Sequence, residues 1–230
     1  MRVARRALLV LAVTVGVLIA LPYLIAPLYR FVDPVSTPML WRWATGGRVE
    51  RTFVPIGLIA PTLPLTVILA EDASFCHNYG IDLSGVREAL QQADDDIAEA
   101  RGGSTITQQT AKNLFLWQGR SFLRKALEIP LAIWLNLVLP KRRVLEIYLN
   151  IVEWGPRGQF GAEAAARWAF GKSARDLTAQ QSAELAAILP NPFRRSARTP
   201  SALVRQLARV YENRAASFPT HDACIRGRAP

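Results

Sequence analysis

Two glutamates, Glu71 and Glu128, lie on either side of a short run of hydroxyl, amide and ammonium side chains. The run reads Gly102-Gly-Ser-Thr-Ile-Thr-Gln-Gln-Thr-Ala-Lys-Asn113. A positioned carboxylate can take a proton from a hydroxyl, and fixed cations can hold an anionic leaving group. The arrangement therefore favours acid/base chemistry on an anionic substrate.

The same run predicts a helix that begins at Thr105. Thr105 followed three residues later by Gln108 forms a capping box, and the two glycines before it suit a tight turn. Helical spacing puts Thr105, Gln109 and Lys112 on one face, and the positive end of the helix favours a phosphate nearby. An ordinary amphipathic helix with a solvated polar face is the alternative, and this segment alone does not separate the two.

The chain is strongly basic, and its arginines gather toward the C-terminus. The formal net charge is +10 and the sequence pI is about 10.4. Such a balance suits nucleic acid, an anionic membrane surface or a phosphorylated substrate, and by itself it separates none of them. The arginines after residue 190 are Arg194, Arg195, Arg198, Arg205, Arg209, Arg214, Arg226 and Arg228.

The stretch Ala7–Ala26 is almost wholly apolar and uncharged, and it has roughly the length needed to cross a bilayer core. Arg2, Arg5 and Arg6 precede it. A cleavable signal peptide has a shorter apolar region and a small-x-small site, which is not clear here. We therefore predict an uncleaved anchor with its N-terminus inside, although Arg30 weakens the charge asymmetry; a buried core helix is the alternative. Location at a membrane disfavours nucleic acid as a partner.

The only cysteines, Cys76 and Cys224, leave two possibilities open. An exported chain could join them, but two cysteines make neither a disulfide framework nor a metal-ligand spacing. The only histidines are His77 and His221, and without a Cys/His cluster a zinc site is not expected.

The apolar run Phe53–Ala70 is interrupted by prolines, which argues against a second membrane span. We predict an extended lead-in and then a short helix, opened by Thr62 and Pro64, that delivers Glu71 and Asp72 at its end. If the run is partly exposed, it would lie against the membrane and hold the site at lipid height.

The rest of the chain predicts a mainly α fold, because strand-like alternation is scarce. Apolar periodicity and helix breakers predict helices over residues 121–139, 141–152, 162–170 and 178–189, with a kink at Pro130 and a turn at residues 155–158. Residues 91–101 form a polar segment expected to be mobile, and residues 201–230 a partly helical tail that frays.

Five blocks in this order resemble the glycosyltransferase family 51 peptidoglycan polymerases, most closely their monofunctional, membrane-anchored branch. The resemblance covers roughly residues 53–200. The blocks are Glu71-Asp-Ala-Ser-Phe75 with Gly80 and Asp82; Gly103-Ser-Thr-Ile-Thr-Gln-Gln-Thr-Ala-Lys-Asn113; Arg124-Lys-Ala-Leu-Glu128; Arg143-Val-Leu-Glu-Ile-Tyr-Leu-Asn150; and Phe170-Gly-Lys172 through Glu184 to Leu189-Pro-Asn-Pro192.

The resemblance implies a lysozyme-like helical lobe, a small membrane-apposed lobe, and polymerisation of lipid II into β-1,4 glycan strands with inversion and release of undecaprenyl pyrophosphate. It implies that Glu71 is the general base and Glu128 the second catalytic carboxylate. Glu128 would orient Arg124 or bind a divalent cation, Mg or Mn, and no cofactor is obligatory. Glu146 and Asn150 match motifs but suit a scaffold equally. The implied substrate-binding residues are Asp72, Ser104, Thr105, Gln109, Lys112, Asn113, Arg124 and Lys125.

The expected organisation has four parts: a cytoplasmic tip and anchor over residues 1–28, an interfacial connector over 29–52, a glycosyltransferase domain over 53–200 and a basic tail over 201–230. The implied partners are lipid II, the lipid-linked glycan chain, membrane lipids and other cell-wall synthesis proteins, with no nucleic acid. The implied location is the inner membrane, with a periplasmic catalytic domain. The sequence contains neither Ser-x-x-Lys nor Lys-Thr-Gly, so we expect no transpeptidase activity.

One position departs from the family pattern. The histidine expected three residues after Phe75 is Asn78, and His77 comes one residue early. Either Asn78 supplies the hydrogen bond or the loop shifts to bring His77 into that position.

Two other functions are open. One is a lytic transglycosylase or muramidase, which needs no cationic pyrophosphate site. The other is a non-catalytic membrane-anchored scaffold, which the altered histidine position favours.

Overall fold

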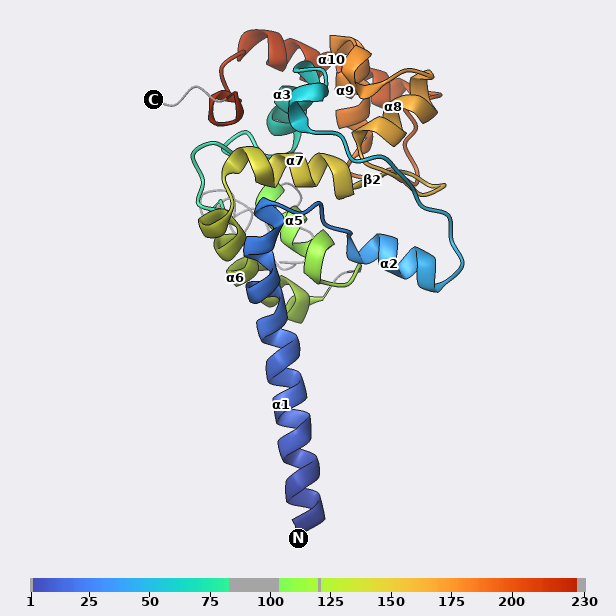
Figure 1. The fold of residues 1–230 in the computed structure, drawn as a ribbon. Helices are drawn as coiled ribbons and strands as arrows, with labels where there is room; N and C mark the ends of the chain where they lie inside the picture. Colours follow the sequence, from blue (N-terminus) through green and yellow to red (C-terminus); the bar gives the residue numbers. More distant parts are fainter. Residues whose placement is uncertain (1, 83–103, 120, 227–230) are drawn as a thin grey trace, which may run out of the picture.

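The computed structural model describes residues 2–82, 104–119 and 121–226, and the predicted mobile segment and glycine turn lie outside these ranges. The described part is mainly helical, which confirms the predicted class (Figure 1). The α-helices are α1 (Arg2–Ile25), α2 (Thr37–Ala44), α3 (Thr62–Glu71), α5 (Ile106–Phe115), α6 (Phe122–Val138), α7 (Lys141–Ile151), α8 (Ala162–Phe170), α9 (Ala179–Ile188) and α10 (Ala202–Ser217).

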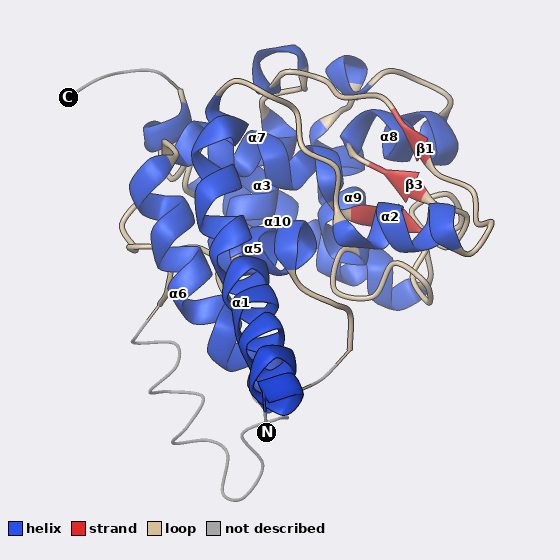
Figure 2. Ribbon diagram, turned by 60° about the horizontal axis from the view of Figure 1, so that its bottom comes forward, coloured by secondary structure: helices blue, strands red, loops and turns tan. Residues whose placement is uncertain are grey.

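Short 3-10 helices and strands connect these helices. The 3-10 helices are η1 (Ala26–Arg30), η2 (Ile56–Leu58), η3 (Ala174–Asp176) and η4 (Ala223–Ile225). Strands β1 (Glu50–Arg51), β2 (Glu153–Gly155) and β3 (Gln159–Phe160) form one sheet in the order β1-β3-β2, with β1 parallel and β2 antiparallel to β3. Figure 2 shows this small sheet at one side of the helical body, beside α8.

Helix α1 projects from the folded body as a single exposed rod (Figure 1). The apolar segment Arg5–Arg30 is long enough to cross a membrane, and its most apolar window is not buried inside the protein. This exposure removes the alternative of a core helix, because a core helix hides its apolar side chains. The helix fits a single-pass membrane anchor.

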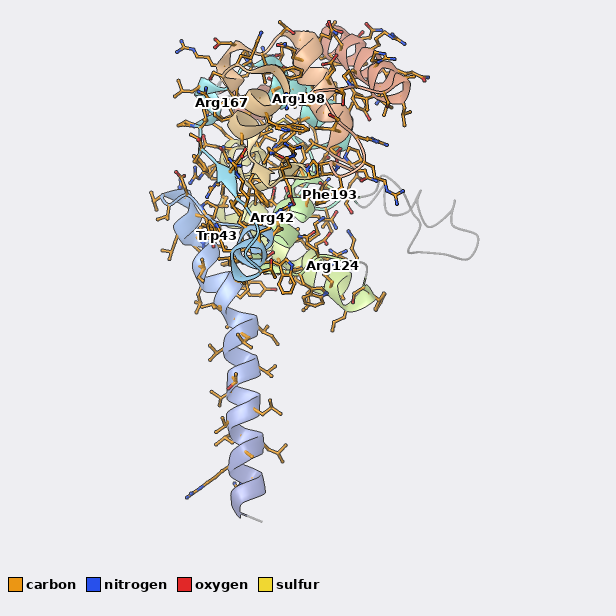
Figure 3. The ribbon with its side chains drawn as sticks, turned by 90° about the vertical axis from the view of Figure 1, so that its right-hand side faces the viewer. Arg42, Trp43, Arg124, Arg167, Phe193 and Arg198 are labelled. Carbon is orange, nitrogen blue, oxygen red and sulfur yellow. A yellow bond between two sulfur atoms is a disulfide. The ribbon has the colours of Figure 1, made fainter. Side chains whose placement is uncertain are left out.

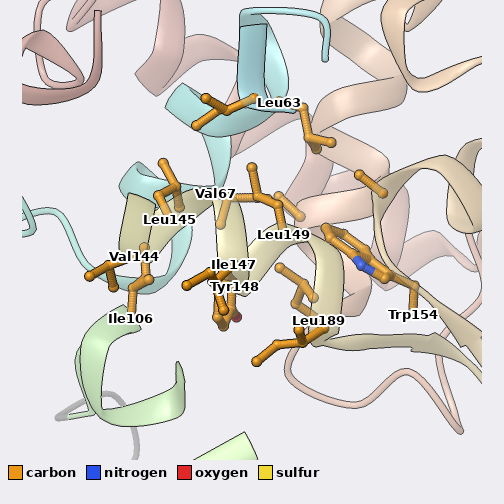
Figure 4. Close-up of a cluster of buried hydrophobic side chains, with 14 of the residues drawn as sticks. Leu63, Val67, Ile106, Val144, Leu145, Ile147, Tyr148, Leu149, Trp154 and Leu189 are labelled. Atoms are coloured by element: carbon orange, nitrogen blue, oxygen red, sulfur yellow. The ribbon is translucent and has the colours of Figure 1, made fainter. Parts of the chain in front are cut away.

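The core forms where α3, α5 and α7 meet (Figure 4). Helix α3 is the predicted short helix that ends at Glu71, but its residues 63–69 are all buried. It packs on α9 and α10, so the expectation that this part of the run lies against the membrane is wrong. The side chains that fill the centre include Leu63, Val67, Ile106, Leu145, Leu149 and Trp154.

A different surface carries exposed apolar side chains next to the anchor. Helix α6 runs unbroken through Pro130 and exposes Phe122, Leu123 and Leu137, which are 85%, 62% and 74% accessible. The Trp134 indole N–H donates to the Tyr23 carbonyl at 3.0 Å, which fixes α6 against the end of α1. In Figure 1, α6 lies on the α1 side of the body.

The segment after Pro200 belongs to the folded body. Helix α10 packs on α9 and α3, so the expected fraying is wrong for residues 202–217. Beyond it, Cys224 forms a disulfide with Cys76, which answers the question of pairing that the sequence left open. The bond closes a sequence separation of 148 residues and holds the segment after α10 against the loop that follows Glu71.

We expect loss of this disulfide to lower thermal stability without unfolding the protein at room temperature. A cross-link across a long loop restricts the unfolded chain and typically contributes about 2–4 kcal/mol. The double variant Cys76→Ser/Cys224→Ser and the reduced wild type should therefore both melt about 5–15 °C below the oxidised wild type in detergent. Equal melting temperatures would show that the bond contributes no stability.

Candidate active site

The carboxylate of Glu71 is held by a relay of hydrogen bonds from two other helices. Its Oε2 accepts from the Gln109 side-chain amide of α5 at 2.9 Å. The Gln109 carbonyl oxygen in turn accepts from the Tyr148 hydroxyl of α7 at 3.0 Å. Tyr148 is fully buried, so it fixes the orientation of the amide and therefore of the carboxylate.

Burial is the main reason that the pKa of Glu71 is raised above its usual range. The Gln109 hydrogen bond and the charges of Lys112 and Arg195 lower the pKa in part, whereas Asp72 raises it only slightly. Desolvation therefore dominates over like charge, a choice that the sequence left open. A carboxyl group with a raised pKa is suited to receive a proton and release it again.

Asp72 and Thr105 join the end of α3 to the start of α5. Asp72 accepts from the Ile106 backbone N–H at 3.0 Å and from Asn78 and Ser74. Thr105 caps α5 as predicted, and its hydroxyl donates to the Gly80 carbonyl at 2.6 Å. Both side chains are buried. The cap and Asp72 occupy N–H groups at the start of α5, so the expected offer of those groups to a phosphate is not seen.

The structure selects Asn78 rather than His77 at the position where the family has histidine. The Asn78 amide donates to both oxygens of Asp72, and His77 is exposed. The Asn78 carbonyl oxygen accepts from the Lys141 ammonium at 2.8 Å. Burial lowers the pKa of Lys141 to about 8, and the charge of Asp72 opposes that shift. Asn78 therefore supplies a hydrogen bond without a titrating ring.

A compact cationic cluster surrounds Glu128. Its two oxygens accept from Arg124 at 2.5 Å and Lys125 at 2.7 Å, and Lys125 also donates to the Ser104 hydroxyl at 2.9 Å. Burial is the main cause that lowers the pKa of Lys112, and the charges of both Glu128 and Glu71 act on it. Lys112 therefore links the two predicted carboxylates electrostatically.

A cleft of about 590 Å³ runs past this face of α5. Gln109, Lys112 and Asn113 form one wall, so the predicted Gln109–Lys112 face does line a cavity, although Thr105 does not. Arg42 of α2, held by a 2.5 Å ion pair to Glu153, also lines the cleft. In Figure 3, Arg42 and Arg124 lie closer to α1 than Phe193, which also lines the cleft.

Two residues that match the family motifs serve the scaffold in this structure. Glu146 accepts from the Ile56 backbone N–H at 2.7 Å, and Asn150 forms hydrogen bonds with both the N–H and the carbonyl of Val54. They hold the segment that leads into α3. Sequence reasoning missed Tyr148 and Arg195 as influences on Glu71, because neither is near it along the chain.

The arrangement around Glu128 does not fit a divalent cation. Both of its oxygens already accept from cationic side chains. Within the described ranges, no three His, Cys, Asp or Glu side chains gather into a metal-binding group. The expectation that no cofactor is obligatory stays a prediction, and no step below uses a metal.

Comparison with known proteins gives a consistent result. A family described as "Transglycosylase" matches residues 40–215. Proteins named biosynthetic peptidoglycan transglycosylase are similar to the chain: one from Rhodopseudomonas palustris strain TIE-1 is 61% identical over 86% of this chain and 84% of its own. One from Nitrobacter hamburgensis is 56% identical over 92% and 93%, and one from Brucella suis is 46% identical over 97% of both. The chain therefore belongs to the transglycosylase family.

Proposed function

We propose that this chain polymerises lipid II into β-1,4-linked glycan strands, releases undecaprenyl pyrophosphate and inverts the anomeric centre. The names of its relatives support peptidoglycan as the product. The observation that carries the proposal is the position of Glu71 beside one face of α5. Gln109 on that face donates to the Glu71 carboxylate and lines the cleft together with Lys112. Burial raises the pKa of Glu71, and the charge of Lys112 acts on it. A strand-cleaving enzyme has no need of such a cation.

In the proposed reaction, Glu71 accepts the proton of the acceptor sugar hydroxyl. The hydroxyl oxygen then forms a bond to the anomeric carbon of the donor while the bond from that carbon to the pyrophosphate oxygen breaks. A single displacement from the opposite face inverts an α-linked donor into a β-linked product. General-base assistance of this kind typically contributes about 10²–10⁴-fold to the rate.

The departing pyrophosphate gains negative charge, and fixed cations stabilise it. Lys112 lines the cleft. Arg124 and Lys125, which Glu128 holds, do not line it, but their charges act on Lys112. We assign Glu128 a positioning role, because both of its oxygens contact these cations and it lies buried beneath them. Asp72 and Thr105 support the site by fixing the start of α5.

We further propose that α1 crosses the inner membrane with its N-terminus in the cytoplasm, following the arginines that precede the span. The exposed apolar face of α6 beside the anchor would then meet the bilayer and keep the cleft near lipid-held substrates. We propose residues 53–217 as the catalytic body, since α10 packs within it. These 230 residues contain no transpeptidase motif, so the proposal assigns them none.

The pH dependence of the reaction should report the state of Glu71. Because burial raises its pKa, activity should fall on acidification at a higher pH than an ordinary glutamate, with its pKa of 4.5, would give. The Gln109 hydrogen bond lowers that pKa, so Gln109→Ala should move the acid limb of kcat/KM to still higher pH. The exposed Gln206→Ala is the control. An acid limb that stays in place in Gln109→Ala contradicts this role for the amide.

Two substrates test the function directly. Purified lipid II should yield a ladder of glycan polymer on a gel, and purified sacculi should release no soluble muropeptides. Release from sacculi without polymer formation would replace the proposal with a lytic enzyme. Inactivity on both substrates, together with full biological effect of a Glu71→Gln variant, would replace it with a scaffold.

A further inference from the structure

A second, smaller pocket of about 260 Å³ adjoins the main cleft, and no part of the mechanism above uses it. The two cavities share the wall formed by Pro192 and Phe193. We call it the arginine pocket; its wall includes Arg157, Arg194, Arg195, Arg198, Trp168 and Phe193.

The charge of the arginine pocket is unbalanced. Among the described residues, no Asp or Glu lines it, and none of its four arginines forms an ion pair with a described residue. Arg157, Arg194 and Arg198 are exposed, so their guanidinium groups are free to meet a ligand. The buried Trp168 indole N–H has no acceptor among the described residues either. Arg195 donates to the Ala187 carbonyl at 2.9 Å, so the other three guanidinium groups are the donors that suit a ligand with several carboxylate oxygens.

The arginine pocket lies near the candidate base and away from the anchor helix, which favours a contact with the substrate rather than with the membrane. Arg195 lines the pocket, and its charge lowers the pKa of Glu71, so the pocket lies within electrostatic reach of the candidate base. In Figure 3, Arg198 lies farther from α1 than Phe193, whereas Arg124 lies nearer to α1. A substrate held by its lipid and phosphate at Arg124 would therefore extend its other parts toward Arg198.

We propose that the arginine pocket binds the carboxylate groups of the peptide carried by the glycan substrate, an inference that rests on the proposed function. A linear peptide joined to the sugar by its amino end presents at least a terminal carboxylate. The planar guanidinium fork matches a carboxylate in two-point contact. The diphosphate has its own cations on the α1 side of the site, which leaves the carboxylates as the anionic groups that reach this pocket. The pocket thus selects substrates with an acidic peptide.

The test compares three lipid-linked substrates in a polymerisation assay: one with an acidic peptide, one with the same peptide amidated at its carboxyl groups, and one without a peptide. Wild type should prefer the acidic substrate in kcat/KM. The double variant Arg194→Gln/Arg198→Gln should reduce the ratio of acidic to amidated substrate about tenfold, mostly through KM. Arg209→Gln, which removes an exposed α10 charge outside the pocket, should keep the wild-type ratio.

The outcomes separate this inference from the proposed function. Failure of the wild type to polymerise any of the three substrates would count against the proposed function itself. Polymerisation by the wild type with no preference for the acidic peptide would overturn the arginine pocket alone. An equal loss on all three substrates in the double variant would also overturn it, because the arginines would then act on the glycan or the phosphates.

Discussion

Replacing Glu71 by glutamine is expected to reduce glycan polymerisation by at least about 10²–10⁴-fold, the usual contribution of a general base. Glutamine keeps the shape of the side chain and a hydrogen bond to Gln109, but it cannot accept the hydroxyl proton. The variant should therefore still bind a donor analogue. Burial raises the pKa of Glu71, so the ionised carboxylate costs stability at neutral pH, and the melting temperature should be preserved or increased.

The measurements for this prediction are turnover of labelled lipid II, analogue binding and thermal melting on the same preparation. Glu212→Gln makes the same chemical change on α10, at a residue that takes no part in the site, and should retain full activity. Substantial turnover by Glu71→Gln would remove this residue from the role of base. A fall in melting temperature together with lost binding would point instead to a structural role.

The second large effect is expected for Lys112→Met. This change removes the cation on which the charges of both Glu71 and Glu128 act. Loss of a preorganised charge-stabilising group typically lowers kcat about 10²–10³-fold. Unlike Glu71→Gln, it should weaken binding of an analogue that carries pyrophosphate. The acid limb of the pH profile should also move to higher pH, because the charge of Lys112 lowers the pKa of Glu71.

Lys172→Met provides a matched comparison, since Lys172 lies in the turn after α8 and outside the cleft. It should leave turnover, analogue affinity and the pH profile as in the wild type. If Lys112→Met lowers turnover but binds the pyrophosphate analogue with unchanged affinity, Lys112 does not hold the leaving group before the reaction, and its contribution would be limited to the transition state. Unchanged turnover would exclude both roles.

Local sequence patterns predicted most helices of this protein. The capping box at Thr105, the prolines before α3 and the apolar periodicity of α6 act between residues a few positions apart, so they can be recognised without knowing the fold. The long apolar segment was recognisable for the same reason, because its length and lack of charge are properties of one stretch of chain.

Sequence alone could not determine which polar residues face the cleft and which are used within the protein. Thr105 caps α5 and Gln109 lies one turn into it, yet Gln109 contacts Glu71 whereas the Thr105 hydroxyl donates to the Gly80 carbonyl. That difference depends on how α3 and α7 pack around α5.

The sequence by itself determined the class of the fold, the anchor and the residue types at the candidate site, since these follow from local spacing and composition. Only the tertiary structure decided the Tyr148–Gln109–Glu71 relay, the disulfide between Cys76 and Cys224, the docking of α10 and the influence of Arg195 on Glu71. The residues joined by these hydrogen bonds and by the disulfide are 38 to 148 positions apart in the sequence. They meet only when the helices pack together. Long-range packing sets desolvation, and desolvation sets the chemistry of Glu71.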